Sequence, residues 1–136
     1  MSILFLLSDF TSFEMNDELS QKVIGAAFKV HNELGFGFVE AVYERALAIE
    51  LENAGVPFDV QSPIKVSYRG QIVGEFVCDV LVDKHLIVEL KSVKALAIAH
   101  EVQLVNYLNA TKIDVGLLIN FGADKVDVKR KFRKSN

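Results

Sequence analysis

Two apolar runs separated by a short charged turn constrain the fold of this 136-residue chain most strongly. The first run is Glu75–Asp83 and the second is His85–Lys91. Runs of this length, rich in Val, Ile and Leu and bounded by turn residues, are typical of β-strands. If residues 83–85 form a three-residue turn, Val82 lies opposite Leu86 in an antiparallel hairpin. The sequence therefore predicts two neighbouring strands of one sheet.

The same register places two acidic side chains opposite each other, Asp79 on the first strand and Glu89 on the second. Strand residues alternate faces, so Glu89 and Lys91 point to one side of the sheet and Leu90 points to the other. Opposed like charges destabilise a ladder unless something positive lies between them. Mg²⁺ is typically held by one or two carboxylates together with water and substrate phosphate. We therefore expect a divalent-cation site at this pair, with the Lys91 ammonium beside it.

The rest of the chain predicts two helices followed by a mixed sheet. Helices are expected over residues 18–34, after the N-cap residues Asn16 and Asp17, and over residues 39–54. Strands are expected at residues 58–61, 64–68, 72–82, 86–91, 115–120 and 126–132, the last at an edge, with a helix at residues 100–110. The helical link between the fourth and fifth strands has the length of a parallel crossover. The order α-α-β-β-β-β-α-β-β predicts an α/β fold with one mixed sheet flanked by helices.

Composition and charge limit the classes of protein. With 51% hydrophobic and 24% charged residues, the chain is expected to form one soluble globular domain without a membrane partner. The net charge of −3 gives no overall attraction to nucleic acid. Six of the fifteen Lys and Arg residues lie in the last twelve positions, however. Such an end is more often solvated than a binding arm, so nucleic-acid contacts are only a weak expectation for Lys129, Arg130, Lys131 and Arg133.

The first residues and the single cysteine add three expectations. The apolar run Ile3–Leu7 is too short for a membrane span, and we interpret residues 1–14 as an extension outside a domain of residues 15–136. An extra strand or a dimer contact is the alternative, and a symmetric homodimer is possible. Cys78 cannot form an intrachain disulfide, so a reducing, cytoplasmic compartment is expected. It should be a buried thiol on the face of Phe76 and Val80, away from Asp79.

Several motifs, in order, resemble those of one nuclease family. Asp79 followed by Glu89-Leu90-Lys91 resembles the D…(D/E)xK signature of the PD-(D/E)xK nuclease superfamily. The segment GFVEAVY at residues 37–43 resembles the motif of the GxxExxY proteins within it, and QLVNY at residues 103–107 resembles the QxxxY helix of RecB-like nucleases. The segments VHNELG at residues 30–35 and GLLINFG at residues 116–122 also look like the GxxExxY family. The resemblance covers residues from about 17 to 130.

The resemblance implies a restriction-endonuclease-like core and a metal centre. By match to the motif, Asp79, Glu89 and the backbone carbonyl of Leu90 would hold Mg²⁺ or Mn²⁺. Lys91 would position or deprotonate the attacking water. Glu40 would add a third carboxylate, although by spacing alone it is a first-turn glutamate favoured by the helix dipole.

Gln103 is a further candidate catalytic residue, and Tyr107 and His31 are candidates for lining the site. Gln103 and Tyr107 share a helix face at i and i+4, which without the motif would be read as a polar seam. The resemblance implies that Gln103 touches the metal-bound water or substrate and that Tyr107 packs beside Lys91. His31 lies next to the buried helix stripe, where a core histidine is more common than a ligand, and it is kept as a possible site-lining residue.

The sequence thus favours a metal-dependent nuclease acting on phosphodiester bonds, with DNA preferred and RNA still open. Phosphate binding would depend on the metal, Lys91, Lys94 and the basic C-terminal segment, so it should be salt-sensitive. One alternative is a non-catalytic nucleic-acid-binding or interaction module that retains the fold. A third interpretation is a phosphatase acting on small phosphorylated metabolites.

Overall fold

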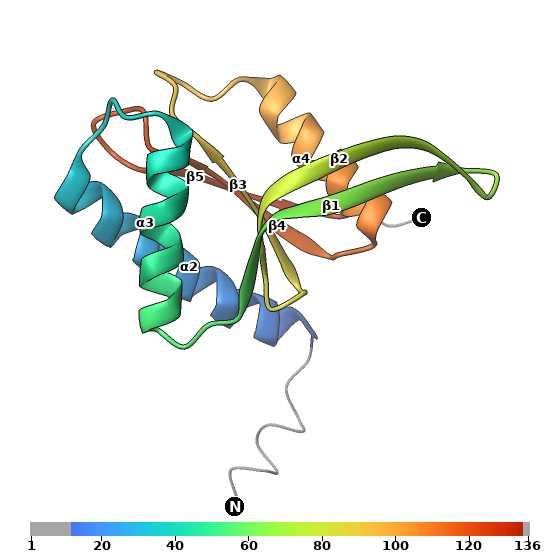
Figure 1. Cartoon of the computed structure of the whole chain (residues 1–136), viewed down its shortest axis with the longest axis horizontal. Coiled ribbons are helices and arrows are strands. Elements are labelled where there is room, and N and C mark those ends of the chain that lie inside the picture. The colour runs from blue at the N-terminus through green and yellow to red at the C-terminus, as the bar shows by residue number, and fades with distance from the viewer. Residues whose placement is uncertain (1–11, 135–136) are drawn as a thin grey trace, which may run out of the picture.

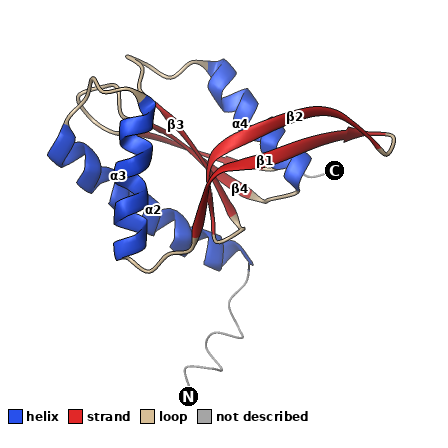
Figure 2. Cartoon of the chain, in the orientation of Figure 1, coloured by secondary structure: helices blue, strands red, loops and turns tan. Residues whose placement is uncertain are grey.

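The computed structural model describes residues 12–134, which form one five-stranded sheet with helices on both faces (Figures 1 and 2). The helices are α2 (Ser12–Leu34), α3 (Glu40–Asn53) and α4 (Ile98–Thr111), and the strands are β1 (Phe58–Tyr68), β2 (Gln71–Val82), β3 (Leu86–Lys91), β4 (Val115–Asn120) and β5 (Asp127–Phe132). The strand order is β1-β2-β3-β4-β5. Strands β3 and β4 are parallel, and every other neighbouring pair is antiparallel. The predicted α/β fold with a mixed sheet is confirmed.

The hairpin at the centre of the sequence argument forms as expected. Val82 pairs with Leu86, and β3 and β4 occupy the predicted residues. Helix α4 makes the crossover between these two parallel strands. Strand β5 lies at one edge of the sheet. Among residues 12–134, no helix is both long and apolar enough to cross a bilayer.

Two predicted boundaries were wrong. The strands expected at residues 58–61 and 64–68 are one continuous strand, β1. Pro63 does not break it, because β1 is an edge strand and a proline there need not donate to a ladder. Helix α2 begins at Ser12 and not near residue 18. No Gly or Pro lies between Ser12 and Asp17 to stop it. The extension expected over residues 1–14 otherwise lies outside the described residues.

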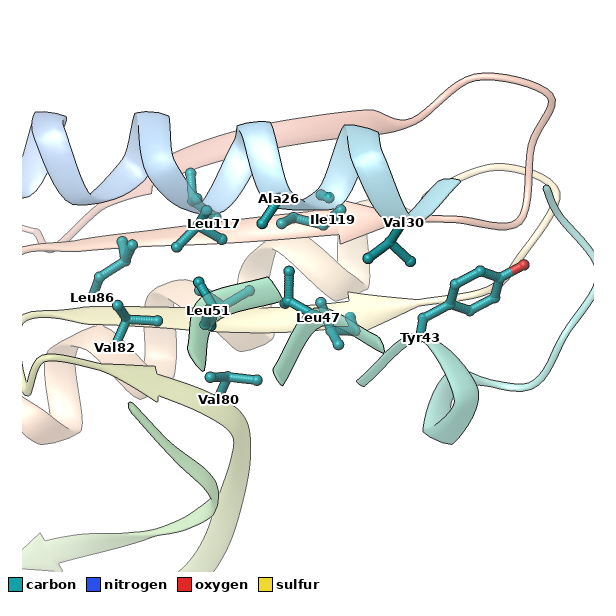
Figure 3. Close-up of a cluster of buried hydrophobic side chains, with 14 of the residues drawn as sticks. Ala26, Val30, Tyr43, Leu47, Leu51, Val80, Val82, Leu86, Leu117 and Ile119 are labelled. Atoms are coloured by element: carbon teal, nitrogen blue, oxygen red, sulfur yellow. The ribbon is translucent and has the colours of Figure 1, made fainter. Parts of the chain in front are cut away.

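Each face of the sheet has its own hydrophobic core. Helices α2 and α3 cover one face, and the cluster between them and the sheet includes Val30, Leu47, Leu51, Val82, Leu86 and Leu117 (Figure 3). Helix α4 covers the other face, and the cluster between it and the sheet comprises Ile64, Cys78, Ile87, Leu104, Tyr107, Leu108 and Leu118. Burial of these two apolar layers on a common sheet is the main driving force for the fold.

Strands β1 and β2 extend beyond the rest of the sheet as a two-stranded arm (Figure 1). Twelve residues long, β2 pairs with β3 only through Val80, Leu81 and Val82. We call the projecting part, residues 62–78, the arm. Its exposed apolar side chains include Tyr68, Ile72, Val73, Phe76 and Val77. The arm leaves β3 at Asp79, so the sheet forks at this residue.

A backbone kink lies opposite the fork. Gln61 has a φ of 50°, and the ladder between β1 and β2 skips the Gln61–Asp79 pair while keeping the pairs on either side. The alternation of faces changes at this point. Cys78 packs in the cluster under α4, whereas Val80 packs in the cluster under α2 and α3. The expectation that Cys78 and Val80 share one face was therefore wrong, because a simple alternation assumes an uninterrupted ladder and this ladder is interrupted at Asp79.

Candidate functional site

Two acidic side chains replace backbone pairing where the sheet forks. The backbone N–H of Asp79 donates a hydrogen bond to Glu89 Oε2 at 3.2 Å. The backbone N–H of Leu90 donates to Asp79 Oδ2 at 2.7 Å. Backbone groups that lose a ladder partner must find another acceptor, and these carboxylates supply it. The fold thus brings Asp79 and Glu89 together and ties each of them to the neighbouring strand.

Burial and charge strongly perturb one of the two acids. Glu89 is buried, with 8% of its surface exposed. Its burial, followed by its hydrogen bond to Asp79 and the charge of Asp79, raises the pKa of Glu89 to about 9. The positive charge of Lys91 lowers the pKa of Glu89 by a smaller effect. Burial disfavours the ionised form of Glu89 and the negative charge of Asp79 adds to this effect, so a cation at this place would stabilise the two carboxylates.

The donor set fits a hard divalent cation. Carboxylate oxygens are the ligands preferred by Mg²⁺, and Mn²⁺ also suits carboxylate and water ligands. Across residues 12–134, no group of three or more His, Cys, Asp or Glu side chains is close enough to hold a metal. Two carboxylates completed by water and phosphate are a usual arrangement for Mg²⁺. The residues present therefore fit a cation that is also bound by water and phosphate, and they do not supply all the ligands of a cation.

Lys91 ends β3 on the same strand face as Glu89. It pairs with Asn120 in the parallel ladder, and its carbonyl accepts the N–H of Phe121 at 2.8 Å. The Asn120 side chain bonds both backbone groups of Val93, accepting at 3.0 Å and donating at 2.8 Å. Sequence reasoning did not single out Asn120. The Asn120 side chain fixes the segment directly after Lys91. The sequence signal that could have found Asn120 is a polar residue at the end of an apolar strand.

Helix α4 adds a tyrosine to the acidic pair. Burial, followed by the negative charges of Glu89 and Asp79, raises the pKa of Tyr107. Gln103 Nε2 donates to Tyr107 Oη at 3.0 Å, as their shared helix face suggested. Between α4 and the arm lies a mostly apolar groove of about 970 Å³, lined by Val66, Phe76, Ile98, Val102, Gln103 and Tyr107 among others. Gln103 and Tyr107 thus lie in the wall of this groove.

Glu40 is not brought into contact with the acidic pair by any described interaction. It is exposed at the start of α3 and lines a separate hollow of about 310 Å³ with Ser92 and Lys94. Glu44, one helical turn further on, is linked to the site through Gln61. Gln61 Nε2 lies 3.2 Å from both Glu44 carboxylate oxygens and 3.4 Å from Asp79 Oδ1. Neither Gln61 nor Glu44 was predicted from the sequence to lie in the site, because neither belongs to the quoted motifs.

Among residues 12–134, no described contact joins the remaining candidates to the acids. His31 is a buried core residue with Nε2 2.8 Å from the carbonyl of Ala123 and its ring stacked on Phe121. Three basic C-terminal residues form ion pairs within the chain: Arg130 with Asp17, Lys131 with Glu101, and Arg133 with Asp114, at 2.7, 3.2 and 2.9 Å. Lys94 and Lys129 are exposed. The ion pairs reduce the positive charge that the C-terminal segment can offer to a phosphate.

Comparison with known proteins identifies the superfamily. A family model described as the PD-(D/E)XK nuclease superfamily matches residues 17–131. A search of curated proteins gave no match. The crystal structure of SSO0001 resembles this chain with a TM-score of 0.57 and 16% sequence identity, over 71% of this chain and 50% of that one. The chain therefore spans about half the length of that protein, and the likeness shows a shared fold. Because the family model covers most of the sequence and the fold agrees with it, this chain belongs to the PD-(D/E)XK nuclease superfamily.

Proposed function

We propose that this chain is a divalent-metal-dependent nuclease that hydrolyses phosphodiester bonds, with DNA as its favoured substrate. Membership of a nuclease superfamily supports a nuclease-type activity in general. The observation that carries the finer proposal is the fork itself, where Asp79 and Glu89 are fixed by each other's strand backbone and Lys91 lies beside them. The two carboxylates accept backbone N–H groups, but uncharged acceptors would do so without the repulsion of two crowded acids.

Each side chain at the fork would have a separate role in the reaction. A bound Mg²⁺ or Mn²⁺ would lower the pKa of a water molecule and stabilise charge on the phosphate. Asp79 and Glu89 would hold the ion, with the carbonyl of Leu90 as a further ligand. The Lys91 ammonium would orient the attacking water and stabilise negative charge as it develops on the phosphate. Gln103 would hold substrate or water from the α4 side, and Glu40 would act from its hollow on the α3 side.

Within the superfamily, we assign the chain to the GxxExxY proteins with a RecB-like QxxxY helix. The motif tyrosine supports the assignment, because it has a clear structural task. Tyr43 Oη donates to the carbonyl of Gly35 at 2.7 Å and accepts the N–H of Phe38 at 3.4 Å, and the hydroxyl points out of the core cluster (Figure 3). The Tyr43 ring stacks on Phe121 at 4.5 Å. Tyr43 thus holds the loop at residues 35–39, which precedes α3 and its first residue, Glu40.

A cleavage assay tests the proposal. The protein is incubated with single-stranded DNA, duplex DNA and RNA in Mg²⁺, Mn²⁺ or a chelator. We expect cleavage that depends on the metal and falls by roughly 100-fold or more in Glu89→Ala and Lys91→Ala, the scale of removing one transition-state-stabilising group. Glu75→Ala and Lys84→Ala remove exposed charges of the same kinds and serve as matched controls. Equal cleavage by the wild type and both site variants would assign the activity to a contaminant.

The alternative is a non-catalytic nucleic-acid-binding module. One observation favours it, because no third acidic side chain joins Asp79 and Glu89 among residues 12–134. Calorimetry with Mn²⁺ separates the two functions. Heat of binding that disappears in Glu89→Ala supports the nuclease, whereas its absence in the wild type supports the module.

A further inference from the structure

Gln61 adopts a backbone conformation that is unusual for its place in the fold. Its φ of 50° lies in the left-handed region, although β1 continues on both sides of it. The other described non-glycine residues with positive φ lie in the hairpin turns or at the C-cap of α4: Arg69, Asp83, Lys84 and Lys112. A strained residue inside a strand persists only when its surroundings hold it, and such residues cluster at functional sites.

The surroundings that hold Gln61 are two carboxylates. Its Nε2 lies 3.2 Å from both oxygens of Glu44 and 3.4 Å from Asp79 Oδ1. The second oxygen of Asp79 accepts the N–H of Leu90 at 2.7 Å. The Asp79 carboxylate is therefore held from two sides, by an amide of β1 and by the backbone of β3.

A neutral amide suits this place chemically. It donates hydrogen bonds to both carboxylates while leaving the negative charge of Asp79 available to a cation. A lysine at residue 61 would add a competing positive charge, and a glutamate would add a third negative charge without a donor.

We propose that Gln61 is a positioning residue, anchored by Glu44 on α3, that sets the orientation of the Asp79 carboxylate opposite Glu89. Its consequence for cation binding rests on the proposed nuclease function. The orientation of the Asp79 carboxylate does not depend on that function, because the hydrogen bond from the Leu90 N–H to Asp79 reports it without any metal.

The decisive variant is Gln61→Gly. Glycine adopts positive φ at no steric cost, so the variant keeps the kink and removes only the amide side chain. Arg69→Gly is the matched control, because Arg69 has nearly the same φ, 49°, in the exposed turn of the arm. Both variants should be at least as heat-stable as the wild type. Only Gln61→Gly should shift the amide-proton resonance of Leu90 upfield, since a loosened carboxylate forms a weaker hydrogen bond.

Cation affinity provides the second measurement. Loss of a group that orients a metal ligand weakens metal binding by roughly 10- to 100-fold, and we expect a loss of this size for Mn²⁺ in Gln61→Gly. A double-mutant cycle with Glu44→Ala shows how Glu44 acts. If Glu44 acts through Gln61, the double variant binds Mn²⁺ no more weakly than Gln61→Gly alone. Additive losses would show that Glu44 acts on the cation independently, and its role as an anchor would be overturned.

The outcomes separate positioning from a purely structural role. An unchanged Leu90 resonance in Gln61→Gly overturns the inference, whether or not the variant loses heat stability. An unchanged Mn²⁺ affinity with a shifted resonance would overturn its consequence for the site. If the wild-type protein neither binds Mn²⁺ nor cleaves nucleic acid, the proposed function fails, but the Leu90 resonance still decides whether Gln61 orients Asp79.

Discussion

At the scale of single residues, Glu89 links the site to the stability of the fold. Its pKa of about 9 lies well above its ordinary value of 4.5, so the unfolded chain binds fewer protons than the folded chain between these values. The free energy of unfolding of the metal-free protein should therefore decrease as pH rises from about 5 to 9. We expect Tm in chelator to fall across this range by at least several degrees.

Two comparisons check the assignment to Glu89. Glu89→Gln should flatten the pH dependence of Tm, whereas the exposed Glu75→Gln should leave it unchanged. Adding Mn²⁺ should raise Tm more at pH 8 than at pH 6, because the cation stabilises the ionised carboxylate. A profile that rises with pH in the metal-free protein would contradict the buried, crowded acid.

Cys78 lies beside the same acids and should be unreactive in the folded state. Burial, followed by the charges of Glu89 and Asp79, raises the pKa of its thiol to about 12. The thiolate is the reactive form, so a thiol-specific reagent at pH 8 should label the native protein far more slowly than the protein in denaturant. Fast labelling without denaturant would show that the core under α4 opens at the fork.

At the scale of elements, the loop after β3 depends on a close approach to the loop after β4. A Cβ added at Gly122 would lie 2.2 Å from the backbone N and O of Val93, so it would overlap these atoms sterically. Gly122→Ala should therefore displace the segment that follows Lys91 and destabilise the protein by roughly 1–3 kcal/mol. Gly25→Ala is the control, because nothing lies within 4 Å of its added Cβ on α2. Thermal unfolding should show a lower Tm for the first variant and an equal or higher Tm for the second.

The elements that could be predicted are those specified by a local pattern. The apolar runs and their turn specified β3, the register of the hairpin and the neighbourhood of Asp79 and Glu89. The length of the link specified the crossover through α4. Glu44 could not be predicted as part of this neighbourhood, because its contact with Gln61 spans 17 residues and depends on how α3 lies over the sheet. The kink at Gln61 was also hidden, since a glutamine carries no preference for positive φ.

At the scale of the whole molecule, three of the basic C-terminal residues are paired within the fold and do not form a basic binding tail. Strand β5 carries Arg130 and Lys131, and their ion pairs reach α2 and α4 on opposite faces of the sheet. Arg133 pairs with Asp114 just before β4. These residues tie the edge strand to its neighbours. If the proposed function holds, phosphate attraction would depend mainly on exposed lysines such as Lys94 and Lys129 and on the proposed cation.

The salt dependence of nucleic-acid binding tests this division. In a chelating buffer, affinity for a short DNA should fall with salt in proportion to the number of phosphates that are contacted. Lys94, exposed beside Glu40, should contribute one such contact, so Lys94→Ala should reduce the slope of log K against log salt by about one. Arg133→Ala should change the slope less, because its guanidinium is already paired with Asp114. The opposite ranking would place the DNA on the C-terminal edge of the sheet, away from the hollow next to α3.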